Sequence, residues 1–235
     1  MIADKKLAKI SRTIDLKHFN PSNLNSEKSK FFASKTYNPQ FTYNPVKYSF
    51  KLLKSISYGY RPIDQLMKAK GKELRAQLLM RKFLGTKKFT NFSKRAYGFP
   101  NEKLIEKAKI YITRVPSKTR ETTKGSIPSS VVQKLFLNEI SLFSNKWTVL
   151  EAPILAKAMV NPTNKTVYIK KNDMFTKIQV DRLIAHEIYG HVLRSVCGEM
   201  QPYKMFSIGF AKYESIEEGL ALYKEKKLVD YPNEF

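Results

Sequence analysis

Cysteine and histidine are scarce in this chain of 235 residues, which contains one cysteine, Cys197, and three histidines. A single cysteine excludes an internal disulfide framework and a cysteine-rich zinc module, and it fits a reducing compartment. Histidine and carboxylate side chains therefore remain as candidate ligands for any metal. The hydrophobic content of 42% is sufficient for a globular core, and the length suits one domain with or without an appended arm.

Long apolar runs are also missing. No stretch approaches the roughly 20 apolar residues that a transmembrane helix needs, and the first residues lack the apolar segment of a secretory signal. Residues 1–30 are rich in Lys, Ser and Asn, as in an organelle transit peptide, but Asp4, Asp15 and Glu27 argue against one. We therefore expect a soluble, cytoplasmic protein, with organelle targeting as the alternative.

Acidic residues are scarce in the first part of the chain. Residues 1–150 contain 31 Lys and Arg against 9 Asp and Glu, whereas residues 151–235 contain 12 against 11. Such a positive field favours an acidic partner for residues 1–150, namely nucleic acid, an anionic membrane surface or an acidic protein tail. Any single lysine can be explained as a side chain that solvates a helix face. This explanation accounts less well for the large excess of basic over acidic residues in 1–150.

The apolar periodicity predicts a succession of helices, then strands, then helices. Helices are expected at 62–83, at 101–112 and from Ser129 or Ser130 through Ile140. Strands are expected at 147–150, 154–160 and 166–169. Two further helices are expected, one at 176–196 that ends near Gly198 and one that Ser215 caps. This order indicates an α+β fold with a small mixed or antiparallel sheet.

The composition also suggests how the domain is organised. Residues 1–36 are polar and basic, and we expect them to form a flexible N-terminal arm. Residues 37–235 would form the folded domain, with helices over 46–145, the sheet over 146–171 and the last helices over 176–224. Residues 115–128 contain two prolines and a glycine without apolar periodicity, so they are expected to be a loop.

Two of the three histidines frame a glutamate in the sequence His-Glu-Ile-Tyr-Gly-His at 186–191. Two imidazoles and a carboxylate on one helix suggest a catalytic zinc site. Histidines four residues apart lie about 40° from each other around an α-helix, but the spacing of five here sets them about 140° apart. They converge if the helix absorbs one residue as a π-bulge, which Gly190 makes sterically inexpensive. The sequence therefore predicts a widened turn at 187–191.

The same motif suggests a role for each residue. His186 and His191 would bind one zinc ion, and Glu187 would be the catalytic residue that takes a proton from the zinc-bound water. A catalytic zinc site needs a third protein ligand, and we expect a carboxylate on a following helix. Glu217 and Glu218 are the available pair, and the residues alone do not decide which binds zinc. The other would orient a ligand or the substrate amine.

Several motifs together resemble a known family. HEIYGHVLR and EEGLA, preceded by YNPQFTY, a Tyr-Gly-x-Pro turn and NKTVYIKKN, are similar to the tyrosine carboxypeptidases that act on tubulin and to bacterial proteins named for a QEGLA motif. The similarity spans roughly residues 37–223. It implies a mononuclear zinc peptidase with a mostly helical, zincin-like domain over 37–235. His186 and His191 match the family's histidine ligands, Glu187 its catalytic glutamate and Glu218 its third ligand.

The resemblance also implies a substrate. The eukaryotic relatives remove a C-terminal tyrosine from an acidic tubulin tail, so we expect a protein or peptide substrate whose scissile bond lies near its C-terminus. A substrate carboxylate needs a cation, and Arg194 is the nearest arginine to the motif. A charge at the C-terminal end of the helix is the other role for Arg194, and the sequence favours it.

Two other functions compete with this one. Dipeptidyl peptidases of the third type also use His-Glu-x-x-Gly-His followed by a Glu-Glu pair, but they are far larger, their second motif lies further away, and it has an additional acidic residue where Leu222 stands here. A basic protein associated with nucleic acid or ribosomes could instead retain a peptidase-like domain. The charge distribution supports that view, but no nucleic-acid-binding module is recognisable.

Overall fold

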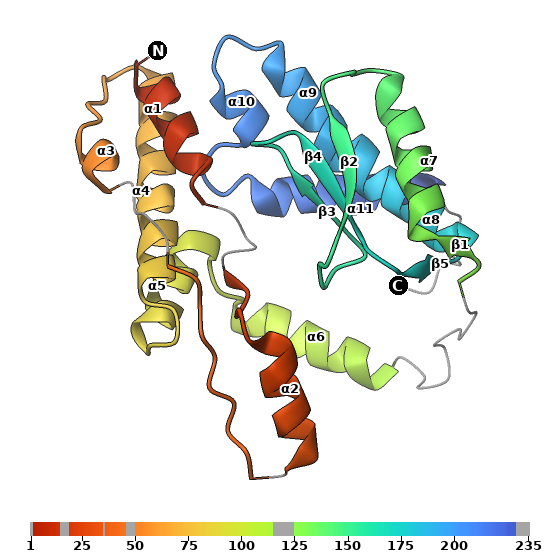
Figure 1. Cartoon of the computed structure of the whole chain (residues 1–235). Coiled ribbons are helices and arrows are strands. Elements are labelled where there is room, and N and C mark those ends of the chain that lie inside the picture. The colour runs from red at the N-terminus through yellow and green to blue at the C-terminus, as the bar shows by residue number, and fades with distance from the viewer. Residues whose placement is uncertain (1, 15–18, 35, 46–49, 115–124, 229–235) are drawn as a thin grey trace. The chain divides into compact units, whose positions relative to one another are not determined.

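The computed structural model describes residues 2–14, 19–34, 36–45, 50–114 and 125–228 (Figure 1). The protein divides into two compact units, residues 1–98 and residues 99–235. The first unit is helical, and the second contains all the strands that the structure describes. In the described ranges, every helix is too short or too polar to cross a bilayer. The arrangement of helices with small sheets confirms the expected α+β class.

The first unit is built around one long helix. Its helices are α1 (Ile2–Ser11), α2 (Leu24–Ala33), α3 (Phe50–Lys54), α4 (Pro62–Lys82) and α5 (Lys88–Tyr97). Helix α4 confirms the helix expected at 62–83, and it begins with a proline at a first-turn position where no backbone donor is lost. Met67, Leu74 and Leu78 recur at helical spacing along α4 and are buried.

The described part of residues 1–36 contains helices α1 and α2, where the sequence indicated a flexible arm. Helix α1 contacts α3 and α4, and its residues Leu7 and Ile10 are fully buried. In a segment this rich in lysine, the apolar residues are few, but they lie three residues apart and therefore share one helix face. The structure also divides the protein after Gly98, and not after residue 36.

The second unit has a helix–sheet–helix order. Its elements are α6 (Glu102–Arg114), β1 (Ile127–Pro128), α7 (Ser129–Ser141), β2 (Thr148–Ala152), β3 (Ala158–Asn161), β4 (Thr166–Lys170), β5 (Met174–Phe175), α8 (Lys177–Leu183), the π-helix η2 (Ile184–Val192), α9 (Leu193–Glu199), α10 (Met205–Ile208) and α11 (Glu214–Leu228). Most of the expected helices and strands are present at nearly the expected positions.

The main sheet has three strands in the order β2-β4-β3. β2 runs parallel to β4, with Val149 opposite Val167, and β3 runs antiparallel to β4, with Val160 opposite Val167. The sheet is therefore mixed. A separate antiparallel pair joins β1 to β5, with Ile127 opposite Phe175.

One face of the main sheet is covered by helices. Val149, Val167 and Ile169 alternate along their strands and are buried, because successive strand residues point to opposite faces. Buried side chains from α7 and η2 complete this core, among them Phe136, Ile140, Ile188 and Val192. Ile188 and Val192 therefore anchor the π-helix on the sheet side.

Three further details differ from the sequence prediction. Helix α11 begins at Glu214, so Ser215 lies inside its first turn, and the Ser215 hydroxyl faces the carbonyl of Lys212 at 3.4 Å. The second strand begins at Ala158, four residues later than expected. Of the expected loop at 115–128, residues 115–124 lie outside the described residues, and Ile127–Pro128 form β1.

Candidate active site

The predicted widened turn is present as a π-helix, η2, at Ile184–Val192. It continues helix α8, whose N-terminus has a capping box: the Thr176 hydroxyl accepts from the Gln179 N–H at 3.2 Å, and Gln179 Oε1 accepts from the Thr176 N–H at 3.1 Å. Hydrogen bonds from i to i+5 place residues five apart on one face. The rings of His186 and His191 accordingly lie with centroids 5.1 Å apart.

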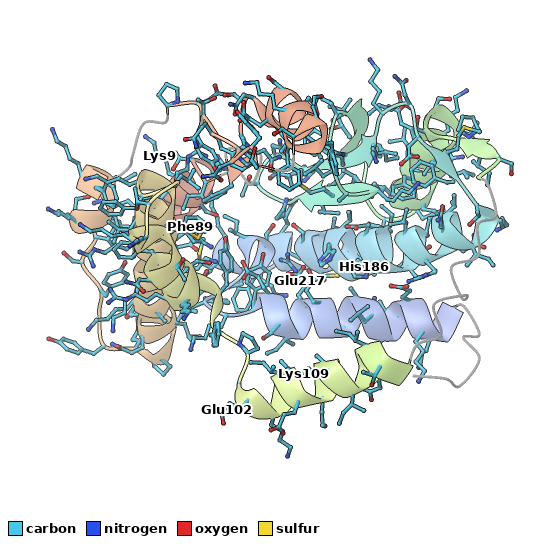
Figure 2. All side chains as sticks on the ribbon, turned by 90° about the horizontal axis from the view of Figure 1, so that it is seen from below. Lys9, Phe89, Glu102, Lys109, His186 and Glu217 are labelled. Carbon is cyan, nitrogen blue, oxygen red and sulfur yellow. The ribbon has the colours of Figure 1, made fainter. Side chains whose placement is uncertain are left out.

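Helix α11 lies against η2 and runs antiparallel to it. Gly190 approaches Ala221 so closely that a Cβ built at Gly190 would lie 2.8 Å from the Ala221 Cβ. Nearby, the Lys224 ammonium donates a hydrogen bond to the carbonyl of Tyr189 at 2.6 Å. Figure 2 shows His186 and Glu217 on the facing sides of these two helices. The contact brings the carboxylates of α11 to the two histidines.

The structure brings His186, His191 and Glu218 together. His186 Nε2 lies 3.4 Å from Glu218 Oε2, and His191 Nε2 lies 3.5 Å from Glu218 Oε1. One ligand atom from each of the three residues lies within 4.8 Å of the others. Tetrahedral zinc with bonds of about 2.1 Å separates its ligand atoms by about 3.4 Å. The two measured distances involve different oxygens of Glu218 and are both close to this value, so the donor types and the approximate spacing are compatible with a zinc ion.

The other nitrogen of each histidine faces a second carboxylate. His186 Nδ1 lies 3.4 Å from Glu225 Oε2, and His191 Nδ1 lies 3.1 Å from Glu217 Oε1. A proton on Nδ1 leaves the lone pair of Nε2 free for a metal. The side chains of Glu217 and Glu225 are 7% and 8% exposed, whereas that of Glu218 is 56% exposed. Glu218 thus lies near the Nε2 atoms of both histidines, whereas Glu217 faces His191 Nδ1. The sequence alone did not distinguish the two glutamates in this way.

Each buried carboxylate is also paired with an arginine. Glu217 Oε1 accepts from Arg194 Nε at 2.8 Å, and Glu225 Oε1 accepts from Arg182 Nε. Arg194 also donates to the carbonyls of Phe206, at 3.1 Å, and of Ser207. Arg194 is the second residue of α9 and contacts α10 and α11, so it does not serve as the charge at the helix C-terminus that the sequence favoured.

The electrostatics of the site reflect its many carboxylates. Burial raises the pKa of Glu187, which also interacts with both histidines and with neighbouring carboxylates. Burial lowers the pKa of His191, but the hydrogen bond to Glu217 and the surrounding negative charge outweigh it, and the net pKa is raised. Burial raises the pKa of Glu217, but the interactions of its carboxylate with His191 and Arg194 outweigh burial, and the net pKa is lowered. Negative charge concentrated in this way favours a cation.

Sequence reasoning missed Glu225 and Arg182. Glu225 stands in the last turns of α11 among lysines, and its distance from the Glu-Glu pair conceals it. The sequence does contain one indication of its role: Glu217, Ala221 and Glu225 are spaced four residues apart, which places all three on one helix face. All three are buried on the side that faces η2.

Comparisons with known proteins identify one family. The family model described as microtubule-associated tyrosine carboxypeptidase matches residues 29–228. Comparison with curated proteins found no match, and neither did comparison with solved structures. The matched range includes η2, α11 and the whole of the main sheet. Because the match extends over most of the sequence, the protein belongs to the family of microtubule-associated tyrosine carboxypeptidases.

Proposed function

We propose that this protein is a zinc-dependent carboxypeptidase that hydrolyses the bond before the C-terminal residue of a protein or peptide. His186, His191 and Glu218 would hold the zinc ion, and Glu187 would be the catalytic base. The observation that carries this proposal is the convergence of three ligand atoms within 4.8 Å from two separate helices. Membership in a carboxypeptidase family supports the same reaction class.

The donor set suits a catalytic zinc site. Two imidazoles and one carboxylate are a known combination for zinc peptidases, and they leave the fourth position for water or substrate. The exposed Glu218 lies on the side of the site that solvent reaches, whereas the carboxylates behind the histidines are buried. Substrate would therefore approach from the side of Glu218.

Each residue of the site has a distinct part in the proposed reaction. Zinc, when bound, would polarise the scissile carbonyl and acidify a water molecule. Glu187, next to His186 in the sequence, would take the proton of the attacking water on a carboxylate oxygen. The same oxygen would then give the proton to the amide nitrogen as the C–N bond breaks, so that the C-terminal residue leaves as a free amino acid. The burial that raises the pKa of Glu187 makes its carboxylate a stronger base.

We further propose that the first unit attracts an acidic polypeptide substrate. In the described part of this unit the acidic residues are all buried, namely Asp4, Glu27, Asp64 and Glu73. Lys68, Lys72 and Arg75 lie exposed on α4 at spacings of four and three residues, so they share one face of the helix. The exposed charges in the described part of the first unit are therefore positive, and a positive surface attracts an acidic polypeptide.

The activity is tested with acidic peptides that end in tyrosine, phenylalanine or glutamate, each with a free or an amidated C-terminus. Mass spectrometry should show loss of one C-terminal residue from at least one free peptide and no loss from its amidated form. Activity should disappear in Glu187→Gln. No trimming of any free peptide by the zinc-loaded protein would refute the carboxypeptidase assignment.

The role of the first unit is tested by reversing its charges. Lys68→Glu/Lys72→Glu/Arg75→Glu should raise KM for an acidic peptide at low salt and leave kcat nearly unchanged. A control with the same change in net charge, Lys146→Glu/Lys171→Glu/Lys226→Glu, alters exposed lysines of the second unit. Equal KM in the two variants, or salt-sensitive binding of nucleic acid in place of the peptide, would contradict this part of the proposal.

A further inference from the structure

The site contains two matching series of contacts on opposite sides of the metal ligands. On one side Arg182 contacts Glu225, which faces His186 Nδ1. On the other side Arg194 contacts Glu217, which faces His191 Nδ1. The arginines lie on α8 and α9, at the two ends of η2, and the glutamates lie on the face of α11 that contacts η2.

The two series differ in how firmly they are enclosed. Glu217 and Glu225 are both buried, so neither can exchange its partner for water without cost. Arg194 is 22% exposed and is held by two carbonyls as well, whereas Arg182 is 44% exposed.

We propose that Arg182–Glu225 and Arg194–Glu217 are positioning pairs, which fix the ring orientation and the Nδ1–H tautomer of His186 and His191 so that both Nε2 atoms face Glu218. This inference rests on the proposed zinc site. A carboxylate behind a ligating imidazole orients the ring and increases its basicity, and removal of such a partner typically costs about 10- to 100-fold in metal affinity. The arginines hold the carboxylates in place and do not contact the metal.

The effect of an arginine substitution on metal affinity distinguishes a positioning role from a purely electrostatic one. Loss of the Arg182 cation makes the site more negative, so an electrostatic effect alone would strengthen the binding of a divalent cation. If Arg182 holds Glu225 in position, its loss weakens binding. Replacement by glutamine, Arg182→Gln, removes the charge and the bond to Glu225 while it keeps a polar side chain at a partly exposed position.

The experiment measures zinc affinity by competition with a chromophoric chelator, together with the visible spectrum of the cobalt-substituted protein. Wild type is compared with Glu225→Ala, Glu225→Gln, Glu217→Ala and Arg182→Gln. Glu199→Ala is the control, because it removes an ion pair with Lys165 that does not face either histidine. Thermal unfolding of each metal-free variant shows whether it is folded.

The alanine variants are expected to lose about 10- to 100-fold in zinc affinity and to shift the cobalt bands. Glu225→Gln should recover most of the loss, since its amide oxygen can accept from Nδ1–H, and Arg182→Gln should weaken binding. The control should bind as wild type does. Wild-type affinity and an unchanged cobalt spectrum in both alanine variants, or tighter binding in Arg182→Gln, would overturn the positioning role. Absence of metal binding in wild type would instead refute the zinc site itself.

Discussion

Gly190 of η2 lies directly against Ala221 of α11, and a Cβ at Gly190 would come 2.8 Å from the Ala221 Cβ and 3.2 Å from its Cα. The close approach places Glu218, one turn before Ala221, beside the histidines. The sequence predicted Gly190 as a residue that eases the distortion of the helix. In the structure its φ is not positive, so the requirement for glycine is the contact between helices.

Substitution of Gly190 should therefore disturb the helix pair. In Gly190→Ala the added methyl group must displace Ala221, and we expect a loss of about 1–3 kcal/mol in the free energy of unfolding. Gly219→Ala is the matched control on α11, because a Cβ there meets no atom within 4 Å. That change should stabilise the metal-free protein by about 0.5–1 kcal/mol, since alanine favours the helix. Urea unfolding measures both values, and equal effects of the two substitutions would contradict the packing argument.

The core beneath the site should be sensitive to loss of volume. Phe136 of α7 is fully buried in the cluster that includes Ile188 of η2. Phe136→Ala should cost about 3–5 kcal/mol of unfolding free energy, because it leaves a cavity. Leu142, at the end of the same helix, is 74% exposed, and Leu142→Ala should change the stability by no more than about 0.5 kcal/mol. Similar losses in the two variants would place Phe136 outside the core.

The first unit should lose stability in acid through Glu27. Its hydrogen bonds with Lys30, Tyr37 and the Gln40 N–H lower its pKa from 4.5 to about 2. A pKa that is lower in the folded state contributes stability above the ordinary value, and this contribution is lost as the pH falls from 4.5 towards 2. In Glu27→Gln, unfolding free energy should therefore fall less steeply over this range than in wild type. The exposed Glu106→Gln is the control, and a wild-type slope in Glu27→Gln would contradict the prediction.

The sequence predicted the architecture of the second unit well, because its apolar patterns are strong. The alternation of Val149, Val167 and Ile169 with polar or exposed neighbours, and the helical spacing of Val132, Phe136 and Ile140, correspond to single buried faces. Spacing also predicted a widened turn at 187–191, since two histidines five residues apart cannot meet on an α-helix, and the structure extends this turn to the π-helix Ile184–Val192. The histidine spacing, which does not suit an α-helix, was thus as informative as the residue types of the motif.

The parts that sequence reasoning missed depend on contacts between distant residues. Helix α1 is stabilised by burial of Leu7 and Ile10 against α3 and α4, which a lysine-rich segment does not reveal. Helix α5 (Lys88–Tyr97) has few strong helix formers, and it forms against α4. Glu225 acquires its place behind His186 only when α11 packs antiparallel to η2. Local pattern predicts helices and strands, but it does not predict which distant side chain will face a given histidine.

The zinc content of three proteins tests the proposed site most directly. Purified wild type, Glu218→Ala and Glu187→Gln are saturated with zinc, dialysed and analysed by atomic absorption, and the release of a C-terminal residue is measured on the same samples. We predict one zinc per molecule in wild type and in an inactive Glu187→Gln, and loss of zinc in Glu218→Ala. Full zinc occupancy in Glu218→Ala, or activity in Glu187→Gln, would contradict the assigned roles.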